Sequence, residues 1–315
     1  MTELAVIIVT WNVRDLALEA LRSLIADLEA GGPKAEIYVV DSASSDGTAN
    51  AIAQAFPTVN VIASPENLGF VRANNLALRR IGFGGATSTT LPQAVYLLNP
   101  DTITQPGATR ALYDTLLTNP RLGLVGAQLA YADGSFQHGA FAFPGLRQLW
   151  VEFFPTPGRL IEGRFNGRYP RHRYLSSQPF PVDFTLGATM MLRREVIEQV
   201  GPLDEGFFMY CEEIDWAWRI KQAGWEVACV PAAHVIHLAG QSTGQARPQS
   251  LIHLWTSRLR LAQKHYPAWK RPLARLLIAT GMWWKAHTAP PDLSNRDEIV
   301  GAYQKIRRMA LGRDS

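Results

Sequence analysis

Short apolar runs alternate with helix-like segments through the first hundred residues, and this alternation limits the possible folds more than any other feature. The first run, residues 4–9, reads Leu-Ala-Val-Ile-Ile-Val, which is typical of a strand buried on both faces of a parallel sheet. We expect further strands over residues 36–40, 59–63, 94–98 and 225–230. We expect helices over residues 15–29, 49–56 and 70–81. This order predicts an α/β fold with a doubly wound, mostly parallel sheet and helices on both faces.

Composition is that of an ordinary folded protein. The chain has 315 residues, of which 47% are hydrophobic and 18% charged, enough for one large domain with an appendage. Two cysteines, Cys211 and Cys229, provide neither a disulfide framework nor a CxxC metal pair, which favours a reducing compartment. The first residues lack the features of a secretory signal, and we expect no membrane-spanning helix, because no uncharged apolar run approaches ~20 residues.

Charge is distributed unevenly along the chain. From Arg247 onward there are 13 Lys and Arg against 4 Asp and Glu, a net of +9, whereas the first 246 residues carry 18 against 23, a net of −5. A basic tail on an acidic body favours an anionic partner, such as a membrane surface or a polyprenyl phosphate. Nucleic acid is a less favoured partner, because Leu and Trp interrupt the basic residues of the tail.

Polar residues follow three of the expected strands, at the edge where open α/β sheets bind ligands. Thr10 and Asn12 follow the first strand, Asp41 follows the second, and Asn99-Pro100-Asp101 follows the fourth. Asp41 could accept a hydrogen bond from a pyrimidine N–H, or could instead form an Asx turn before the next helix. Asp101 could hold Mg²⁺ or Mn²⁺ against a diphosphate, or could cap the following helix. No GxGxxG follows the first strand, so the dinucleotide-binding fingerprint is missing.

The segment from Phe207 to Arg219 carries three carboxylates directly after an aromatic turn. Such dense charge beside aromatic residues is costly to half-bury unless it is used. In a helix beginning near Glu212, Asp215 and Arg219 would lie four residues apart and could pair. Glu213 would then face a cleft, where an ordinary ionised carboxylate can serve as a general base. The alternative is an acidic first turn that the helix dipole stabilises.

Three further segments each allow two interpretations. His234 and His237 are three residues apart without an HExxH context, so His237 could ligate a metal or could only form a hydrogen bond. Residues 136–180 are rich in Pro, Gly, aromatic residues and Arg, which indicates a lid or acceptor loop, or a variable surface excursion. Residues 257–285 mix Leu and Trp with basic residues, as in a segment lying on a membrane or in helices packing onto the rest of the chain.

Eight pieces of the sequence follow one another in an order typical of one enzyme family. They are Val6–Asn12, Val39–Thr48, Asn67–Phe70 with Ala73–Asn75, Leu97–Asp101, Gly187–Ala188 with Arg193–Arg194, Gly201–Phe208, Tyr210–Arg219 and His237–Ser242. Together they resemble an inverting family 2 glycosyltransferase of the GT-A fold, and more narrowly the bacterial rhamnosyltransferase-type branch that builds surface polysaccharides. The resemblance covers residues 5 to about 242, and it implies a GT-A nucleotide-diphospho-sugar transferase fold.

The resemblance also implies roles for individual residues. The nucleotide sugar would contact Thr10, Asn12, Asp41, Asn67, Asn75 and Asn99. Glu213 matches the catalytic base, although the family has Asp there, so Glu212 competes for this role. Asp101 matches the last aspartate of the DxD motif and would ligate Mg²⁺ or Mn²⁺ together with His237, whereas Asn99 replaces the first aspartate. The acceptor side would include Gly187, Ala188 and Asp215.

Domains, substrates and location follow from the same resemblance. Residues 1–245 would form the catalytic domain, with a nucleotide-binding half over 1–102, an acceptor half over 103–245 and an insertion over about 136–180. Residues 246–315 would form a helical extension that contacts an anionic membrane, on the cytoplasmic face of the cell membrane. The enzyme would transfer L-rhamnose from dTDP-rhamnose, or galactofuranose or glucose from a UDP donor, to a lipid-linked glycan. A nucleotidyltransferase is the rival function, but it needs a Gly-rich phosphate loop that Thr10-Trp11-Asn12 does not provide.

Overall fold

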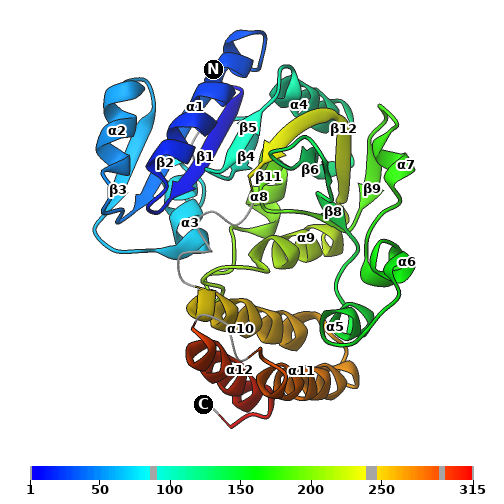
Figure 1. Cartoon of the computed structure of the whole chain (residues 1–315). Coiled ribbons are helices and arrows are strands. Elements are labelled where there is room, and N and C mark those ends of the chain that lie inside the picture. The colour runs from blue at the N-terminus through cyan, green and yellow to red at the C-terminus, as the bar shows by residue number, and fades with distance from the viewer. Residues whose placement is uncertain (1, 86–90, 239–246, 291–294, 314–315) are drawn as a thin grey trace. The chain divides into compact units, whose positions relative to one another are not determined.

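The computed structural model describes residues 2–85, 91–238, 247–290 and 295–313 (Figure 1). The chain divides into two compact units. Unit 1 comprises Met1–Phe141, Arg171–Gly206 and Glu213–Ser242, and unit 2 comprises Ala142–Pro170, Phe207–Glu212 and Thr243–Ser315. The segment over 136–180 is therefore divided between the two units, and it forms short strands and helices.

Unit 1 is built on a mixed sheet with the strand order β3-β2-β1-β4-β11-β6-β12-β5. These strands are β1 (Leu4–Thr10), β2 (Ala35–Ser42), β3 (Asn60–Ser64), β4 (Ala94–Leu98), β5 (Thr102–Thr104), β6 (Leu122–Ala130), β11 (Thr189–Arg193) and β12 (Glu226–His237). Four short strands complete the unit: β7 (Phe136–Gln137) pairs with β6, β9 (Phe180–Val182) with β12, and β8 (Ala140–Phe141) with β10 (Phe184–Thr185). The first four strands are parallel to one another, as expected, and β11 then lies antiparallel to both β4 and β6.

The helices of unit 1 include the three expected over residues 15–29, 49–56 and 70–81, each to within one residue at either end. They are α1 (Arg14–Glu29), α2 (Thr48–Ala55), α3 (Gly69–Ile81), α4 (Ala108–Thr118), α7 (Arg171–Tyr174), α8 (Arg194–Val200) and, except for its first residue, α9 (Glu212–Gln222). In α1, Ala17, Ala20, Leu21 and Leu24 are fully buried, because spacings of three and four alternate on one face of a 3.6-residue helix. Leu16 and Leu28, at the two ends, are only half-buried.

The last strand is longer than its sequence indicates. The apolar pattern predicts its end at Val230, yet β12 continues to His237. Its pairing with β6 shifts register between Val230 and His234, next to Pro231. Proline cannot donate a hydrogen bond to a neighbouring strand, so within a sheet it is tolerated where the regular pairing is interrupted, as it is here. The extension brings His237 to the edge of the sheet, opposite Thr102 of β5.

Unit 2 is helical. Its elements are α5 (Leu146–Phe153), α6 (Gly158–Ile161), the 3₁₀ helix Arg164–Asn166, α10 (Arg247–His265), α11 (Lys270–His287) and α12 (Arg296–Ala310). Helix α11 packs against both α12 and α5 (Figure 1). A Cβ atom added at Gly281 would lie 2.1 Å from Cγ of Phe153, so glycine allows the close approach of α11 to α5. The Phe153 ring in turn stacks on Trp255 of α10, at 5.0 Å between centroids.

Candidate active site

The ends of adjacent strands bring four of the candidate residues to one edge of the sheet. Strand β1 lies between β2 and β4, and Thr10 lies directly opposite Asp41 in the parallel register. Asn99 follows the same end of β4. Strand β11 begins at this edge because it runs antiparallel to β4, so the preceding Gly187 lies there as well. These residues therefore form a candidate binding site at the carboxyl edge of the sheet.

Asp41 is the centre of a buried hydrogen-bond network. Its side chain is only 3% exposed. Oδ1 accepts the hydroxyl protons of Thr10, at 2.8 Å, and of Ser44, at 2.6 Å, while Oδ2 accepts the Ser44 N–H at 3.0 Å. The adjacent Asn12 has a left-handed backbone, with φ of 51°, and its side-chain oxygen accepts the N–H of Ser45 at 2.7 Å. These bonds fix the two loops, and a carboxylate can accept a further donor at Oδ2.

Asp101 and His237 lie next to each other. Nε2 of His237 is 3.5 Å from Oδ1 of Asp101, and both side chains are more than nine-tenths buried. The backbone N–H of Leu238 donates to the Asp101 carbonyl oxygen at 2.9 Å, which ties the two chain segments together. On the far side of the ring, Nδ1 of His237 lies 3.3 Å from Oε1 of the buried Gln137. Helix α4, which Asp101 could have capped, has the carboxylate of Asp27 at its first N–H groups instead.

This arrangement suits a divalent cation. Metal–ligand bonds of about 2.1 Å place neighbouring ligands of an octahedral ion about 3.0 Å apart, so the 3.5 Å separation needs only a small adjustment. If Nδ1 donates to Gln137, Nε2 presents its lone pair to the Asp101 carboxylate. A cation held by these two acceptors would relieve their repulsion. The described residues contain no group of three or more His, Cys, Asp or Glu that could hold a metal, so other ligands, such as diphosphate oxygens, would have to complete the shell.

Gly187 and Ala188 connect this pair to the candidate base. The N–H of Asn99 donates to the Ala188 carbonyl oxygen at 3.0 Å, which fixes the loop that carries Asp101. A Cβ atom added at Gly187 would lie 3.8 Å from Cβ and Cγ of Glu213, so the two residues are neighbours. The loop at Gly187 and Ala188 therefore contacts both Glu213 and Asn99, which lies two residues before Asp101.

The other carboxylates of the acidic segment are arranged as the sequence suggests. Asp215 is fully buried and accepts a hydrogen bond from Nε of Arg219 at 2.9 Å, which confirms the expected pairing. The same guanidinium donates to two backbone carbonyl oxygens before α9. Glu212 is the first residue of α9 and is 6% exposed. Tyr210 and Cys211, just before it, both have left-handed backbones, with φ of 67° and 64°. Such conformations cost non-glycine residues free energy, and they cluster at functional sites.

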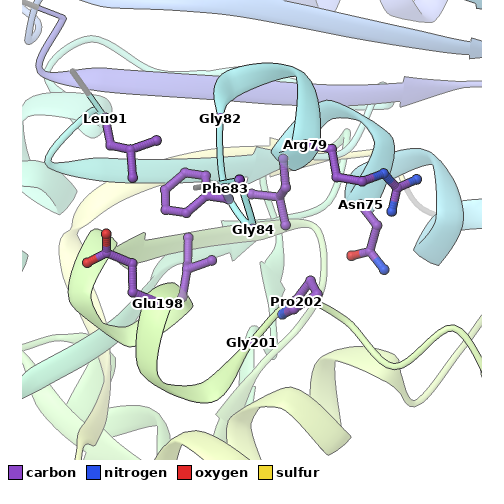
Figure 2. A pocket seen from close by; sticks show the side chains of 12 residues that line it. Asn75, Arg79, Gly82, Phe83, Gly84, Leu91, Glu198, Gly201 and Pro202 are labelled. Carbon is purple, nitrogen blue, oxygen red and sulfur yellow. The ribbon is translucent and has the colours of Figure 1, made fainter. Parts of the chain in front are cut away.

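Two of the asparagines expected at the donor site have structural partners. Nδ2 of Asn75 donates to the Leu203 carbonyl oxygen at 2.9 Å, and Oδ1 accepts the Leu203 N–H at 3.1 Å. Asn67 accepts the N–H of Gly69 at 2.9 Å, at the start of α3. Asn75 also borders a cavity of about 440 Å³ between α3 and α8 (Figure 2). Neither Asp41 nor Asp101 lines this cavity, so it lies apart from the candidate site.

Comparison with known proteins decides the family. The family described as "Glycosyl transferase family 2" matches residues 5–201, more than half of the chain. The chain belongs to glycosyltransferase family 2. It is 31% identical over 245 residues to an "N-acetylglucosaminyl-diphospho-decaprenol L-rhamnosyltransferase" of Mycobacterium tuberculosis, covering 75% of this transferase and 78% of the relative. It is also 43% identical over 58 residues to "Rhamnosyltransferase WbbL" of Escherichia coli, covering 18% and 22% of the two chains.

Solved structures show the fold of this transferase. One is GalNAc-T7 with UDP, GalNAc and Mn²⁺, with a TM-score of 0.60 at 15% identity, covering 99% of this chain and 55% of that one. Another is the mannosyltransferase PcManGT from Pyrobaculum calidifontis with GDP-Man and Mn²⁺, with a TM-score of 0.54 at 17% identity, covering 98% and 84%. The expected GT-A fold is confirmed.

Two neighbours of the candidate site carry no sequence signal of their own. Gln137 lies in a two-residue strand, within a segment whose composition indicates only a loop. Ser44 belongs to a run of small polar residues that reads as a turn, although it donates twice to Asp41. The motif that follows His237 extends to Ser242, and residues 239–242 lie outside the described part of the chain.

Proposed function

We propose that this transferase moves L-rhamnose from dTDP-rhamnose to a hydroxyl of a lipid-linked glycan, with inversion at the anomeric carbon. The observation that carries this proposal is the similarity, over 75% of the chain, to a protein named for L-rhamnosyl transfer to a decaprenol-linked acceptor. The second relative named as a rhamnosyltransferase supports the same sugar. We place the reaction at the cytoplasmic face of the membrane, with residues 1–245 as the catalytic domain and residues 246–315 as the extension.

In the proposed mechanism, Glu213 takes the proton of the acceptor hydroxyl while its oxygen attacks the anomeric carbon. The new C–O bond forms on the face opposite the departing diphosphate oxygen, which leaves with the electron pair of the broken bond. Asp41 holds the base by accepting its ring N–H at Oδ2, and Thr10 and Ser44 fix the carboxylate for this task. A Mg²⁺ or Mn²⁺ ion bound by Asp101 and His237 would supply positive charge to the leaving diphosphate.

The role of Glu213 is tested by exchanging the base for its amide. Glu213→Gln should keep the dissociation constant for the donor and lower kcat by about 10²-fold or more, because a positioned general base contributes that much. Glu212→Gln is the matched comparison, since it removes the adjacent carboxylate. Full activity of Glu213→Gln with an inactive Glu212→Gln would assign the base to Glu212 instead.

The donor is tested by binding. A thermal-shift screen of dTDP-rhamnose, UDP-galactofuranose and UDP-glucose should give the largest rise in melting temperature with dTDP-rhamnose and Mn²⁺, because a ligand stabilises the fold that binds it. Asp101→Ala should abolish the dependence of this shift on Mn²⁺. A larger shift with either UDP-sugar would overturn the rhamnosyl assignment, and an equal shift with and without Mn²⁺ in the wild type would overturn the metal site.

A further inference from the structure

Helix α11 of unit 2 has one buried and one exposed apolar face. The buried face contains Ala274, Ile278, Ala279, Gly281 and Met282. The exposed face contains Trp269, which immediately precedes the helix, and Leu273, Leu276, Trp283 and Trp284. At about 100° per residue, these five side chains fall within an arc of about 100°. Trp269 is 66% exposed and Leu276 is 57% exposed, so the stripe is open over its length.

The cations of α11 lie outside this stripe and have partners within unit 2. Arg271 donates to the Tyr266 carbonyl oxygen at 2.8 Å, and Arg275 donates to that of Met309 at 2.9 Å. Lys285 lies 3.6 Å from Glu152. Thr280 and His287 also lie in this arc, and each bonds a backbone carbonyl oxygen of the same helix, at 2.9 and 2.8 Å. The exposed stripe is therefore mainly a surface of Trp and Leu, in a helix with no acidic residue.

The charge around the stripe indicates what can cover it. Residues 247–291 contain eight Lys and Arg and no Asp or Glu, so α10 and α11 together present positive charge only. A second copy docked on this face would bring two such surfaces together with no carboxylate from either helix to pair with them. An anionic surface with an apolar interior satisfies both properties, because it takes up the apolar side chains and attracts the surrounding cations.

We propose that Trp269, Leu273, Leu276, Trp283 and Trp284 form a docking surface that inserts into the headgroup region of an anionic lipid bilayer. Tryptophan favours this region, since its ring is apolar and its N–H finds water or headgroup oxygens. None of the helices in the described ranges is long and apolar enough to span a bilayer, so α11 would lie in the plane of the surface. This proposal depends on the proposed function in one respect: the lipid-linked acceptor would lie at such a bilayer.

Vesicle binding by the full chain tests this inference. The wild type should bind vesicles of phosphatidylcholine with phosphatidylglycerol, more weakly at higher salt, and vesicles of phosphatidylcholine alone much less. The double variant Leu276→Gln with Trp284→Gln should lower the partition coefficient by about tenfold or more, since it withdraws two large apolar side chains. Leu175→Gln is the matched control: it removes an exposed leucine of unit 1 and should leave partitioning unchanged.

Two further measurements make each outcome decisive. Transfer to a short water-soluble acceptor should be the same in wild type and double variant, and their melting temperatures should agree, because the changed side chains are exposed. Loss of transfer in both proteins would contradict the proposed function and leave the vesicle result standing. Equal vesicle binding by both proteins would overturn the docking surface. So would a dimer, detected by analytical ultracentrifugation, that the double variant dissociates.

Discussion

Gln137 should control how tightly the transferase binds its proposed metal ion. Its side-chain oxygen lies 3.3 Å from Nδ1 of His237, and by accepting a proton from Nδ1 it would select the tautomer that offers the Nε2 lone pair toward Asp101. Gln137→Met keeps the length of the side chain but removes the acceptor. The imidazole could then carry its proton on Nε2, which would have to be lost before a metal could bind there.

The size of the effect follows from the geometry. Removing a hydrogen-bond partner of a metal-ligating histidine typically lowers metal affinity by about 10–100-fold. Because the contact is longer than the usual 2.9–3.0 Å, we expect the lower end, about tenfold or roughly 1.4 kcal/mol. The buried imidazole N–H also loses its acceptor, which should lower the free energy of unfolding by about 1–3 kcal/mol.

Calorimetric titration of Mn²⁺ into the transferase saturated with dTDP measures this affinity directly. Gln128→Met is the matched control, since it makes the same exchange in neighbouring β6. Oε1 of Gln128 is buried without a hydrogen-bond partner, so Gln128→Met should keep both the stability and the Mn²⁺ affinity of the wild type. If Gln137→Met binds Mn²⁺ as tightly as the wild type, Gln137 does not position His237. Gln137→Glu, which retains an acceptor, should restore most of the affinity.

Two predictions concern stability. Gly281→Ala should lower the free energy of unfolding of unit 2 by about 2–3 kcal/mol, because its Cβ would lie 2.1 Å from the Phe153 ring. Gly301→Ala in α12, with nothing within 4 Å of its Cβ, should instead raise it by about 0.5–1 kcal/mol, and urea denaturation that ranks the two variants the other way would contradict this packing. A hydrogen bond from Asn75, with help from an arginine, lowers the pKa of Glu205 below its ordinary value of 4.5. The resulting stabilisation is present above pH 4.5 and is lost as the pH falls through the lowered pKa. Glu205→Gln should therefore lower the free energy of unfolding at pH 7 by about 0.5 kcal/mol, the contribution of so exposed a pair, and the difference from the wild type should shrink on acidification. A difference that grows below pH 4.5 would refute this account.

The strand ends of unit 1 could be predicted because burial produces a simple pattern of apolar residues in the sequence. A strand covered on both faces is apolar at every position, so the first polar residue after it marks the edge of the sheet. Thr10, Asp41 and Asn99 were found in this way, and the structure brings them to one edge. A spacing of four likewise predicted the ion pair of Asp215 with Arg219.

Contacts between segments that are distant in the sequence produced no such pattern and could not be predicted. The buried Asn75 bonds the backbone of Leu203, and a single sequence cannot show which of many distant backbone groups an amide will meet. Gln137 was missed for the same reason, because its partner His237 lies on another strand. Asp27 looks like an ordinary helical residue, yet it satisfies two N–H groups at the start of α4.

The ladder that joins β5 to the end of β12 has a consequence for how the chain assembles. Asp101 and His237 belong to distant parts of the sequence, and the pairing of Thr102 with His237 sets them side by side. Until β12 pairs with β5, an ion at Asp101 would lack its histidine, so a nascent chain would have both protein ligands in place only after this pairing. When bound, the ion would stabilise the pairing of the three-residue strand β5 with β12. Removal of the ion should therefore weaken this pairing.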